Sequence, residues 1–217
     1  MSSRAAARHL DQQASDAAYD RWAPVYDLIF NLPFQPGRRA AARAAGAGGE
    51  ILVVGVGTGL ELPLLPAASR VTGVDVSQPM LDVARKRVAR LGLEQVKALL
   101  EMDAQELGFG DAVFDTALAP FVMSVVPDPA KALDEMWRVV RPGGELVVMN
   151  HFAAEKGWRV GVETAMEGAA HWLGWRPRFP YSAVGDWLAT HPEARLIERR
   201  ELPPLAMFTL LRIGKPG

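Results

Sequence analysis

Several residue types and patterns are missing from this sequence, and each absence excludes a class of protein. No cysteine occurs among the 217 residues, which excludes disulfides and thiolate ligands, and we expect no metal site. No apolar run reaches the roughly 18 residues that a transmembrane helix needs, and residues 1–10 lack the apolar core of a secretory signal. The 24 basic and 25 acidic residues give a net charge of −1, which argues against nucleic acid as a partner.

The composition instead favours a folded domain with a sizeable core. The chain is 49% hydrophobic and 23% charged, and its length suits a single α/β domain. We expect one domain over residues 1–217. Its expected parts are an N-terminal helical lid at 1–45, a ligand-binding core at 50–150, a helical insertion at 151–193 and a hairpin at 194–213.

Apolar stretches alternate with helical patterns through the expected core. Ser77 and Gly92 are typical boundary residues of a helix over 79–91, and Asp128 precedes another helix. The pattern predicts buried strands at 50–56, 70–75, 96–102, 114–120 and 145–150, with a turn at 141–144 before the last of them. Helices between buried strands predict a parallel, doubly wound sheet.

The end of the chain follows a different pattern. Two strands are predicted at 194–201 and 207–212, and the few residues between them allow only an antiparallel connection. We therefore expect an α/β fold whose seven-stranded, mostly parallel sheet is completed by an antiparallel C-terminal hairpin.

Three alternate glycines follow the first predicted strand. Gly55, Gly57 and Gly59 allow a sharp turn and close approach to a ligand, and Thr58 lies among them. Asp75 ends the next strand, 20 positions after the first glycine, where a carboxylate can accept hydrogen bonds from ribose hydroxyls. A plain turn with a capping aspartate would give the same letters, but the strand, loop, helix and acid together favour a nucleoside site.

Further candidates lie at the ends of the third and fourth predicted strands. Asp103 could accept from an exocyclic adenine amine, although a single acid is more often a solvated surface group. Phe121, Met123 and Met80 could flank an adenine or a methylthio chain, although such residues are more often part of the core.

Taken together, these motifs resemble those of class I S-adenosylmethionine-dependent methyltransferases. The resemblance lies in residues 55–59, 74–81, 102–104, 114–115 and 141–144. It implies a Rossmann-like fold and S-adenosyl-L-methionine as the cofactor, with S-adenosyl-L-homocysteine as the product. The cofactor contacts it implies are Tyr19, Gly55, Gly57, Thr58, Gly59, Asp75, Val76, Met80, Asp103, Ala104, Ala119 and Phe121.

The flanking segments narrow the resemblance to one group within this class. Residues 19–27, 122–129, 150–152 and 155–157 resemble bacterial phosphatidylethanolamine N-methyltransferases of the Rhodobacter type. This implies methylation of the phosphatidylethanolamine headgroup, and of its mono- and dimethyl products, toward phosphatidylcholine. A quinone or small-molecule methyltransferase, and a nucleoside-binding module without catalysis, are the alternatives.

One position departs from the class pattern. Members usually have an acid two positions before the first glycine, where it helps to organise the amino-acid end of the cofactor, and here that position is Val53. Backbone carbonyls near Gly55, or the segment containing Tyr19 and Tyr26, could take over this role. We expect cofactor binding to survive because the ribose and adenine contacts remain.

The acceptor needs a site that suits an amine and a phosphodiester. An ethanolamine amine must lose a proton before it attacks, and the methylated product is a fixed cation that favours aromatic and phenol groups. Candidates for catalysis are Tyr26, Asn150, His151 and Tyr181, although a single histidine is often structural. Candidate cations for the phosphate are Lys156, Arg159 and Arg178, although scattered cations are usually solvated.

The lipid acceptor implies contact with a membrane surface. Arg4, Arg8 and His9 precede the first acid and could bind anionic lipid, and Trp22, Phe30 and Phe34 could enter the interface. An ordinary solvated helix is the alternative. We expect a monomer in the cytoplasm that binds reversibly to the inner face of the cytoplasmic membrane.

Overall fold

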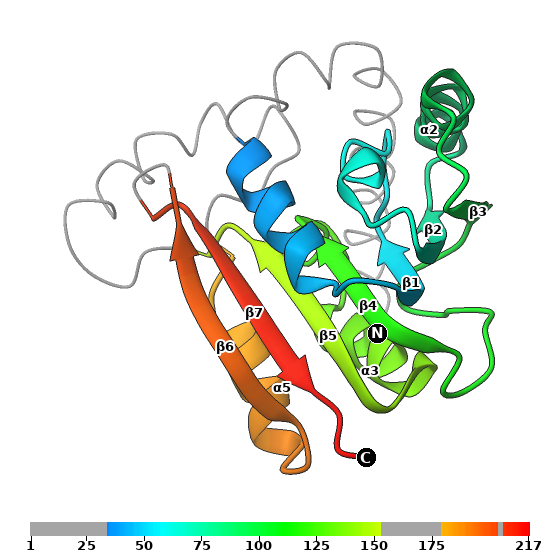
Figure 1. Cartoon of the computed structure of the whole chain (residues 1–217). Helices are drawn as coiled ribbons and strands as arrows, with labels where there is room; N and C mark the ends of the chain where they lie inside the picture. Colours follow the sequence, from blue (N-terminus) through cyan, green and yellow to red (C-terminus); the bar gives the residue numbers. More distant parts are fainter. Residues whose placement is uncertain (1–33, 153–178, 204–205) are drawn as a thin grey trace, which may run out of the picture.

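The computed structural model describes residues 34–152, 179–203 and 206–217. These residues contain one seven-stranded sheet and the helices that pack on it. The strand order is β3-β2-β1-β4-β5-β7-β6 (Figure 1). The strands are β1 Gly49–Val54, β2 Ser69–Asp75, β3 Val96–Glu101, β4 Phe114–Pro120, β5 Val140–Asn150, β6 Arg195–Leu202 and β7 Phe208–Gly214. The helices are residues 34–44, η1 Leu62–Leu64, α2 Gln78–Leu91, α3 Pro129–Val139 and α5 Ser182–Thr190.

Strands β1 to β5 pair in parallel, as the sequence predicts. Strand β1 pairs with β2 on one side and with β4 on the other, so the strand order reverses beside it. In an open α/β sheet, ligands bind outside the carboxyl ends of the strands at such a reversal. The sheet topology therefore places a crevice at the end of β1.

Strands β6 and β7 form the predicted antiparallel hairpin. Strand β7 pairs with both β5 and β6 in antiparallel register, so the last strand of the chain lies inside the sheet and β6 forms its edge. The sequence predicts the hairpin but not this order, because the order depends on which strand contacts β5.

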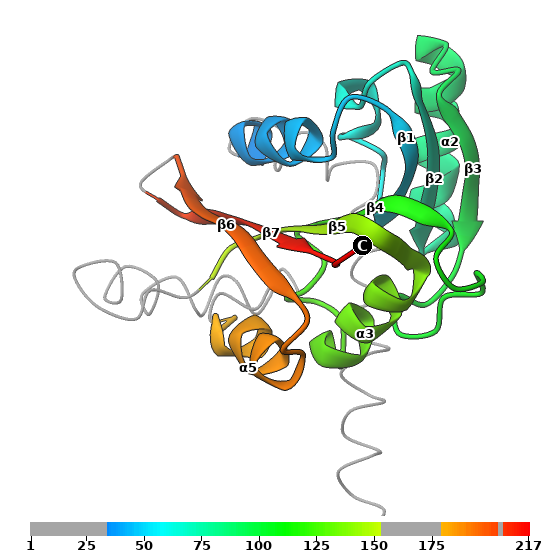
Figure 2. The same ribbon diagram turned by 60° about the horizontal axis from the view of Figure 1, so that its bottom comes forward.

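Helices cover both faces of the sheet (Figure 2). One apolar cluster joins the helix at 34–44, η1 and α2 to side chains such as Ile51 and Val53 of β1. The other joins α3 and α5 to the opposite face, where Leu52 and Val54 of β1 point. Consecutive residues of β1 thus point to opposite faces, and both faces are buried, as a near-continuous apolar strand requires.

The predicted boundary residues Ser77, Gly92 and Asp128 are confirmed. The hydroxyl of Ser77 accepts a hydrogen bond from the backbone N–H of Met80 at the start of α2, and Gly92 ends that helix in a left-handed conformation. Asp128 caps α3 by accepting from the backbone N–H groups of Ala130 and Lys131.

The predicted turn at 141–144 lies inside β5 rather than before it. Val140 already pairs with Phe114, and regular pairing resumes only when Glu145 reaches Thr116. The segment between them is an irregularity within a longer strand. The prediction was wrong here because a Pro-Gly-Gly sequence is typical both of a turn and of an interruption in strand pairing.

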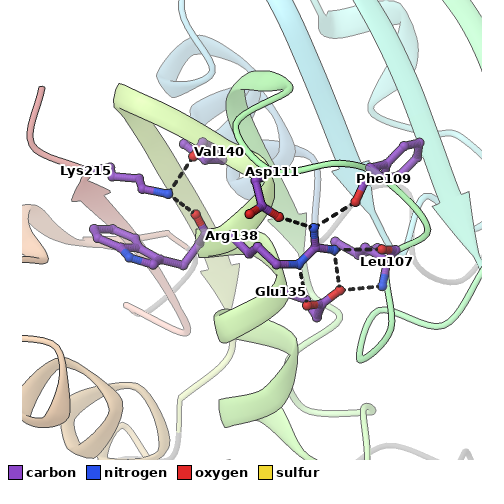
Figure 3. Close-up of polar contacts among 8 residues, drawn as sticks. Leu107, Phe109, Asp111, Glu135, Arg138, Val140 and Lys215 are labelled. Atoms are coloured by element: carbon purple, nitrogen blue, oxygen red, sulfur yellow. Dashed lines mark hydrogen bonds and ion pairs between the residues drawn. The ribbon is translucent and has the colours of Figure 1, made fainter.

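A polar network fixes α3 to the loop after β3 (Figure 3). Arg138 donates hydrogen bonds to the carboxylates of Glu135 and Asp111 and to the backbone carbonyls of Leu107 and Phe109. Glu135 also accepts from the backbone N–H of Leu107. These hydrogen bonds lower the pKa of Glu135 and raise that of Arg138. The network attaches the last turn of α3 to the segment that leads into β4.

Candidate functional site

A cavity of about 380 Å³ lies at the carboxyl ends of the parallel strands, where the topology predicts a ligand. Its walls come from the loop after β1, the end of β2, the start of α2 and the segments after β3 and β4. Nine of the predicted cofactor residues line it: Gly55, Gly57, Thr58, Asp75, Val76, Met80, Asp103, Ala104 and Phe121. The structure thus brings together side chains that lie far apart in the sequence.

Asp75 lies in the middle of this wall and is fixed from two sides. Its Oδ2 accepts a hydrogen bond from the backbone N–H of Gly57 at 2.7 Å, and its Oδ1 accepts from the backbone N–H of Ser77 at 3.0 Å. Burial raises the pKa of Asp75, and the backbone hydrogen bonds partly oppose this shift. Each carboxylate oxygen has a second lone pair, so an ordered carboxylate remains able to accept from a diol.

The glycine loop brings the backbone close to Asp75. Gly57 has a φ of 50°, and a Cβ built at this position would meet no atom within 4 Å, so the residue faces open space on the cavity side. The guanidinium of Arg87 on α2 donates to the carbonyl of Thr58 and ties the loop to the helix. Gly59 does not line the cavity; it lies against Leu62 and Ala84, where a Cβ would collide.

The segment after β3 forms another part of the cavity wall. The carboxylate of Asp103 accepts from the backbone N–H of Gln105 at 2.8 Å and also from its side-chain amide. Ala104 is buried beside it, and Met102 and Val126 add apolar surface. Ala119, in contrast, is enclosed within β4 and does not line the cavity.

Phe121 follows β4 in a backbone conformation that is uncommon for a bulky residue. Its φ is 63°, and its N–H donates to the carbonyl of Met149 at 2.6 Å. The ring packs edge-on against Phe34, with the ring centroids 4.9 Å apart, and also against Phe208. Residues in such a conformation persist only where the surrounding packing enforces it, and they cluster at functional sites.

Two buried charged residues of the cavity wall were not predicted from the sequence. Glu61 and Arg38 line the cavity, and both are buried, with 4% of each residue exposed. Arg38 Nε lies 3.8 Å from Glu61 Oε2, and Glu61 Oε1 has no hydrogen-bond partner among the described residues. Burial raises the pKa of Glu61 to about 7, which the nearby positive charge of Arg38 opposes only in part.

Three of the predicted acceptor residues lie near the end of β5 but do not line the cavity. Asn150 and His151 are buried, and His151 Nδ1 lies 2.6 Å from the carbonyl of Met207, which fixes the ring with Nδ1 as the donor. Tyr181 precedes α5; its ring lies under the guanidinium of Arg199, at 3.8 Å from the ring centroid, and beside Phe152. The remaining predicted residues, Tyr19, Tyr26, Lys156, Arg159 and Arg178, lie outside the described residues.

Known proteins resemble this chain in sequence and in fold. Residues 52–148 match the family model described as a methyltransferase domain. A phosphatidylethanolamine N-methyltransferase of Cereibacter sphaeroides is 44% identical over 207 residues, which cover 95% of this chain and 100% of the relative. A demethylmenaquinone methyltransferase of Thermus thermophilus is 39% identical over 144 residues, which cover 62% of this chain and 64% of the relative.

A solved structure with the same architecture is that of a SAM-dependent methyltransferase from Aquifex aeolicus. It superposes with a TM-score of 0.68 at 19% identity, and the match covers 89% of this chain and 97% of that one. At this level of identity the likeness shows the fold alone.

Proposed function

Because this chain belongs to the family of class I S-adenosylmethionine-dependent methyltransferases, we propose that it methylates the amine of phosphatidylethanolamine and of its mono- and dimethyl derivatives. The observation that supports this acceptor is the similarity to the Cereibacter sphaeroides enzyme, which extends over 95% of this chain. The cofactor half alone would not support it, because that half serves many acceptors.

The residues of the cavity fit S-adenosylmethionine, the methyl donor of this enzyme. Asp75 is held by two backbone N–H groups and retains acceptor capacity for the two ribose hydroxyls, and Asp103, which lines the same cavity, would accept from the adenine amine. Gly57 leaves space for the ligand beside Asp75, and Glu61 Oε1 is a buried acceptor without a partner among the described residues. The site therefore offers acceptors to a ligand that is rich in donors.

When bound, the cofactor supplies a methyl group on a positively charged sulfur, which is already a good leaving group. The protein has to align the acceptor nitrogen with the S–CH₃ bond and exclude water. The nitrogen lone pair forms the new N–C bond as the S–C bond breaks, and the amine proton is lost to a base or to water. An apolar site lowers the pKa of the ammonium and so increases the fraction of reactive amine.

We place the acceptor headgroup beyond the carboxyl ends of β4 and β5, toward Asn150 and His151. His151 could take part in proton removal, while Tyr26 and Tyr181 would face the growing cationic headgroup. Lys156, Arg159 and Arg178 would pair with the phosphodiester. These roles follow from the resemblance and from the position of the residues in the sequence.

We also propose that the protein meets its substrate at the inner face of the cytoplasmic membrane, as a monomer that binds reversibly. Within residues 34–152, 179–203 and 206–217, no helix combines the length and apolarity needed to cross a bilayer. Contact through basic and aromatic side chains near the N-terminus would bring the enzyme to the headgroup without insertion of a span.

The test is incubation of the protein with methyl-labelled cofactor and vesicles of defined composition, followed by lipid mass spectrometry. Vesicles with phosphatidylethanolamine should yield lipids heavier by one, two and three labelled methyl groups. The variant Asp75→Asn is the control for cofactor dependence and should give little product. If the protein transfers labelled methyl groups to another acceptor but the lipid stays unlabelled, the lipid assignment is overturned.

The similarity to demethylmenaquinone methyltransferases supports a second candidate, methylation of a quinone ring carbon. That similarity covers 62% of this chain, against 95% for the lipid enzyme, so it supports the quinone acceptor less strongly than the lipid acceptor. Parallel vesicles with demethylmenaquinone and without phosphatidylethanolamine distinguish the two, since only one vesicle type should gain labelled methyl groups.

A further inference from the structure

The cavity contains a buried carboxylate that the ribose and adenine contacts leave unused. Glu61 precedes η1, which packs on the same face of the sheet as Val53 of β1. An acid is usual in this family at the position of Val53, and here that side chain is apolar and buried. The face of the sheet that lacks the usual acid therefore has another acid within reach of the cavity.

The surroundings of Glu61 leave one oxygen of its carboxylate without a hydrogen-bond donor among the described residues. Its Oε2 lies 3.8 Å from Arg38 Nε, which is too long for a good hydrogen bond, and its Oε1 has no hydrogen-bond partner among the described residues. A buried carboxylate is costly unless several donors surround it. Since Glu61 lines the cavity, a ligand can supply the donors that the protein does not.

The position of Glu61 in the cavity matches the amino-acid end of the cofactor. Asp103 is near the edge of the sheet, after β3, and Asp75 is next, at the end of β2. Arg38 lies further along, where its guanidinium is 5.6 Å from the ring centroid of Phe121 after β4. Adenine, ribose and methionine follow one another in the same order, so the cofactor tail reaches the Glu61 end of the cavity.

We propose that the carboxylate of Glu61 binds the α-ammonium of the cofactor's methionine moiety and thereby replaces the acid that Val53 lacks. The ammonium donates to Oε1, while Arg38 stays beside Oε2 and orients the carboxylate. This inference rests on the cofactor of the proposed function and not on its lipid acceptor.

The test is a comparison of three ligands by calorimetry in the absence of lipid. S-Adenosylhomocysteine has the whole amino-acid end, its desamino analogue lacks only the ammonium, and 5′-methylthioadenosine lacks the whole end. Glu61→Gln should lower the affinity for S-adenosylhomocysteine by about 10- to 100-fold, because a charged hydrogen bond is lost. The same variant should change the affinities for the other two ligands by less than about twofold, because neither ligand has the ammonium.

The matched control is Glu94→Gln, which alters an exposed glutamate outside the cavity and should leave all three affinities unchanged. Unchanged binding of S-adenosylhomocysteine by Glu61→Gln would overturn the proposal. Equal weakening of all three ligands would do so too, because it would make Glu61 a purely structural residue.

A second measurement uses only the wild-type protein, so it tests the proposed role of Glu61 even if the variant does not fold. The charged groups that face Glu61 are Arg38, Arg87 and Asp75. Because the pKa of Glu61 is raised to about 7, its carboxylate becomes charged between pH 6 and 8. The affinity for S-adenosylhomocysteine, relative to the desamino analogue, should rise about 10-fold over this range.

Titration of Asp75 affects both ligands alike, since both contain the ribose, and cancels in this ratio. A ratio that does not change with pH would contradict the proposal. Failure of lipid methylation with this binding pattern intact would count against the acceptor alone, so the two failures are distinguishable.

Discussion

Asp75 is fixed by backbone donors on both carboxylate oxygens, and this makes it sensitive to a small change. The backbone N–H of Gly57 in the glycine loop donates to one oxygen, and the backbone N–H of Ser77 at the start of α2 donates to the other. In Asp75→Asn, one oxygen becomes an NH₂ group that faces a backbone N–H, so one donor loses its partner and a ribose acceptor is lost.

We expect Asp75→Asn to weaken S-adenosylhomocysteine and 5′-methylthioadenosine alike, by about 10- to 100-fold. Calorimetry of both ligands checks this, with Glu94→Gln as the control. A loss confined to S-adenosylhomocysteine would mean that Asp75 contacts the amino-acid end instead of the ribose.

We expect the ionised carboxylate of Glu61 to strengthen cofactor binding but to lower the free energy of unfolding of the unliganded protein. Burial raises its pKa from 4.5 to about 7, so between these values the folded protein keeps a proton that the unfolded chain has lost. Stability therefore falls as the pH rises through this window. The unliganded Glu61→Gln variant should be more stable than wild type at pH 8, by on the order of 2–3 kcal/mol, and about equal at pH 4.5.

Chemical denaturation at the two pH values measures this difference, with Glu94→Gln again as the control. Equal stabilities at pH 8 would show that the carboxylate is adequately solvated or paired without a ligand.

The cavity residues differ in how far a sequence can reveal them. Asp75 was predictable because it ends a strand at a fixed distance from a glycine loop, which is a local pattern. Glu61 has no such pattern, since its burial depends on a helix at 34–44 that packs across the sheet. The left-handed φ of Phe121 also depends on tertiary packing.

At the level of elements, Arg138 makes several of the hydrogen bonds that attach α3 to the loop after β3. Arg138 makes hydrogen bonds to two carboxylates and two carbonyls, and its side chain is only 32% exposed. Removal of the guanidinium leaves the carbonyls of Leu107 and Phe109 without this donor.

We expect Arg138→Met to lower the free energy of unfolding by about 1–3 kcal/mol at pH 7. The pKa of Glu135 is lowered by Arg138, so this pair stabilises the fold above the ordinary carboxylate pKa and loses its effect as the pH falls below about 4. Urea denaturation at pH 7 and pH 3.5 should therefore show a smaller difference at the lower pH.

The control is Arg200→Met, which removes an exposed ion pair on the edge strand and should cost less than about 0.5 kcal/mol. Affinity for S-adenosylhomocysteine should be unchanged in both variants. An Arg138 variant as stable as the control would mean that water replaces the network at no cost.

Strands and helices followed closely from periodicity and capping residues, because those signals act within a few positions. Ser77, Gly92 and Asp128 end or begin the helices as predicted. The segment at 141–144 did not follow, because a strand can continue through a Pro-Gly-Gly sequence when a neighbour offers pairing on either side of it. That neighbour is β4, which is distant in sequence.

For the whole molecule, the order of the strands and the family together explain where the cofactor binds. The assignment of the acceptor rests on similarity to a known enzyme. The predicted acceptor residues within the described part lie outside the cavity, and the phosphate-binding candidates lie outside the described residues. Sequence patterns specify a nucleoside loop well because its geometry is fixed, whereas an acceptor site varies with the acceptor.

Membrane contact can be tested on the intact protein. We expect more protein to sediment with anionic than with neutral vesicles, and we expect the difference to shrink as salt increases, because the attraction is electrostatic. The double variant Arg4→Gln/Arg8→Gln should reduce the sedimented fraction, and Arg85→Gln/Arg90→Gln on α2 is the matched control. Equal sedimentation with both vesicle types would contradict the proposal.

The loosely paired carboxylate of Glu61 also has a consequence for the heat of cofactor binding. If the ammonium of the ligand ionises a group whose pKa is about 7, each binding event near neutral pH expels a fraction of a proton into the buffer. The heat measured in Tris, which absorbs protons exothermically, should then be more favourable than the heat measured in phosphate. The free energy of binding should be the same in both.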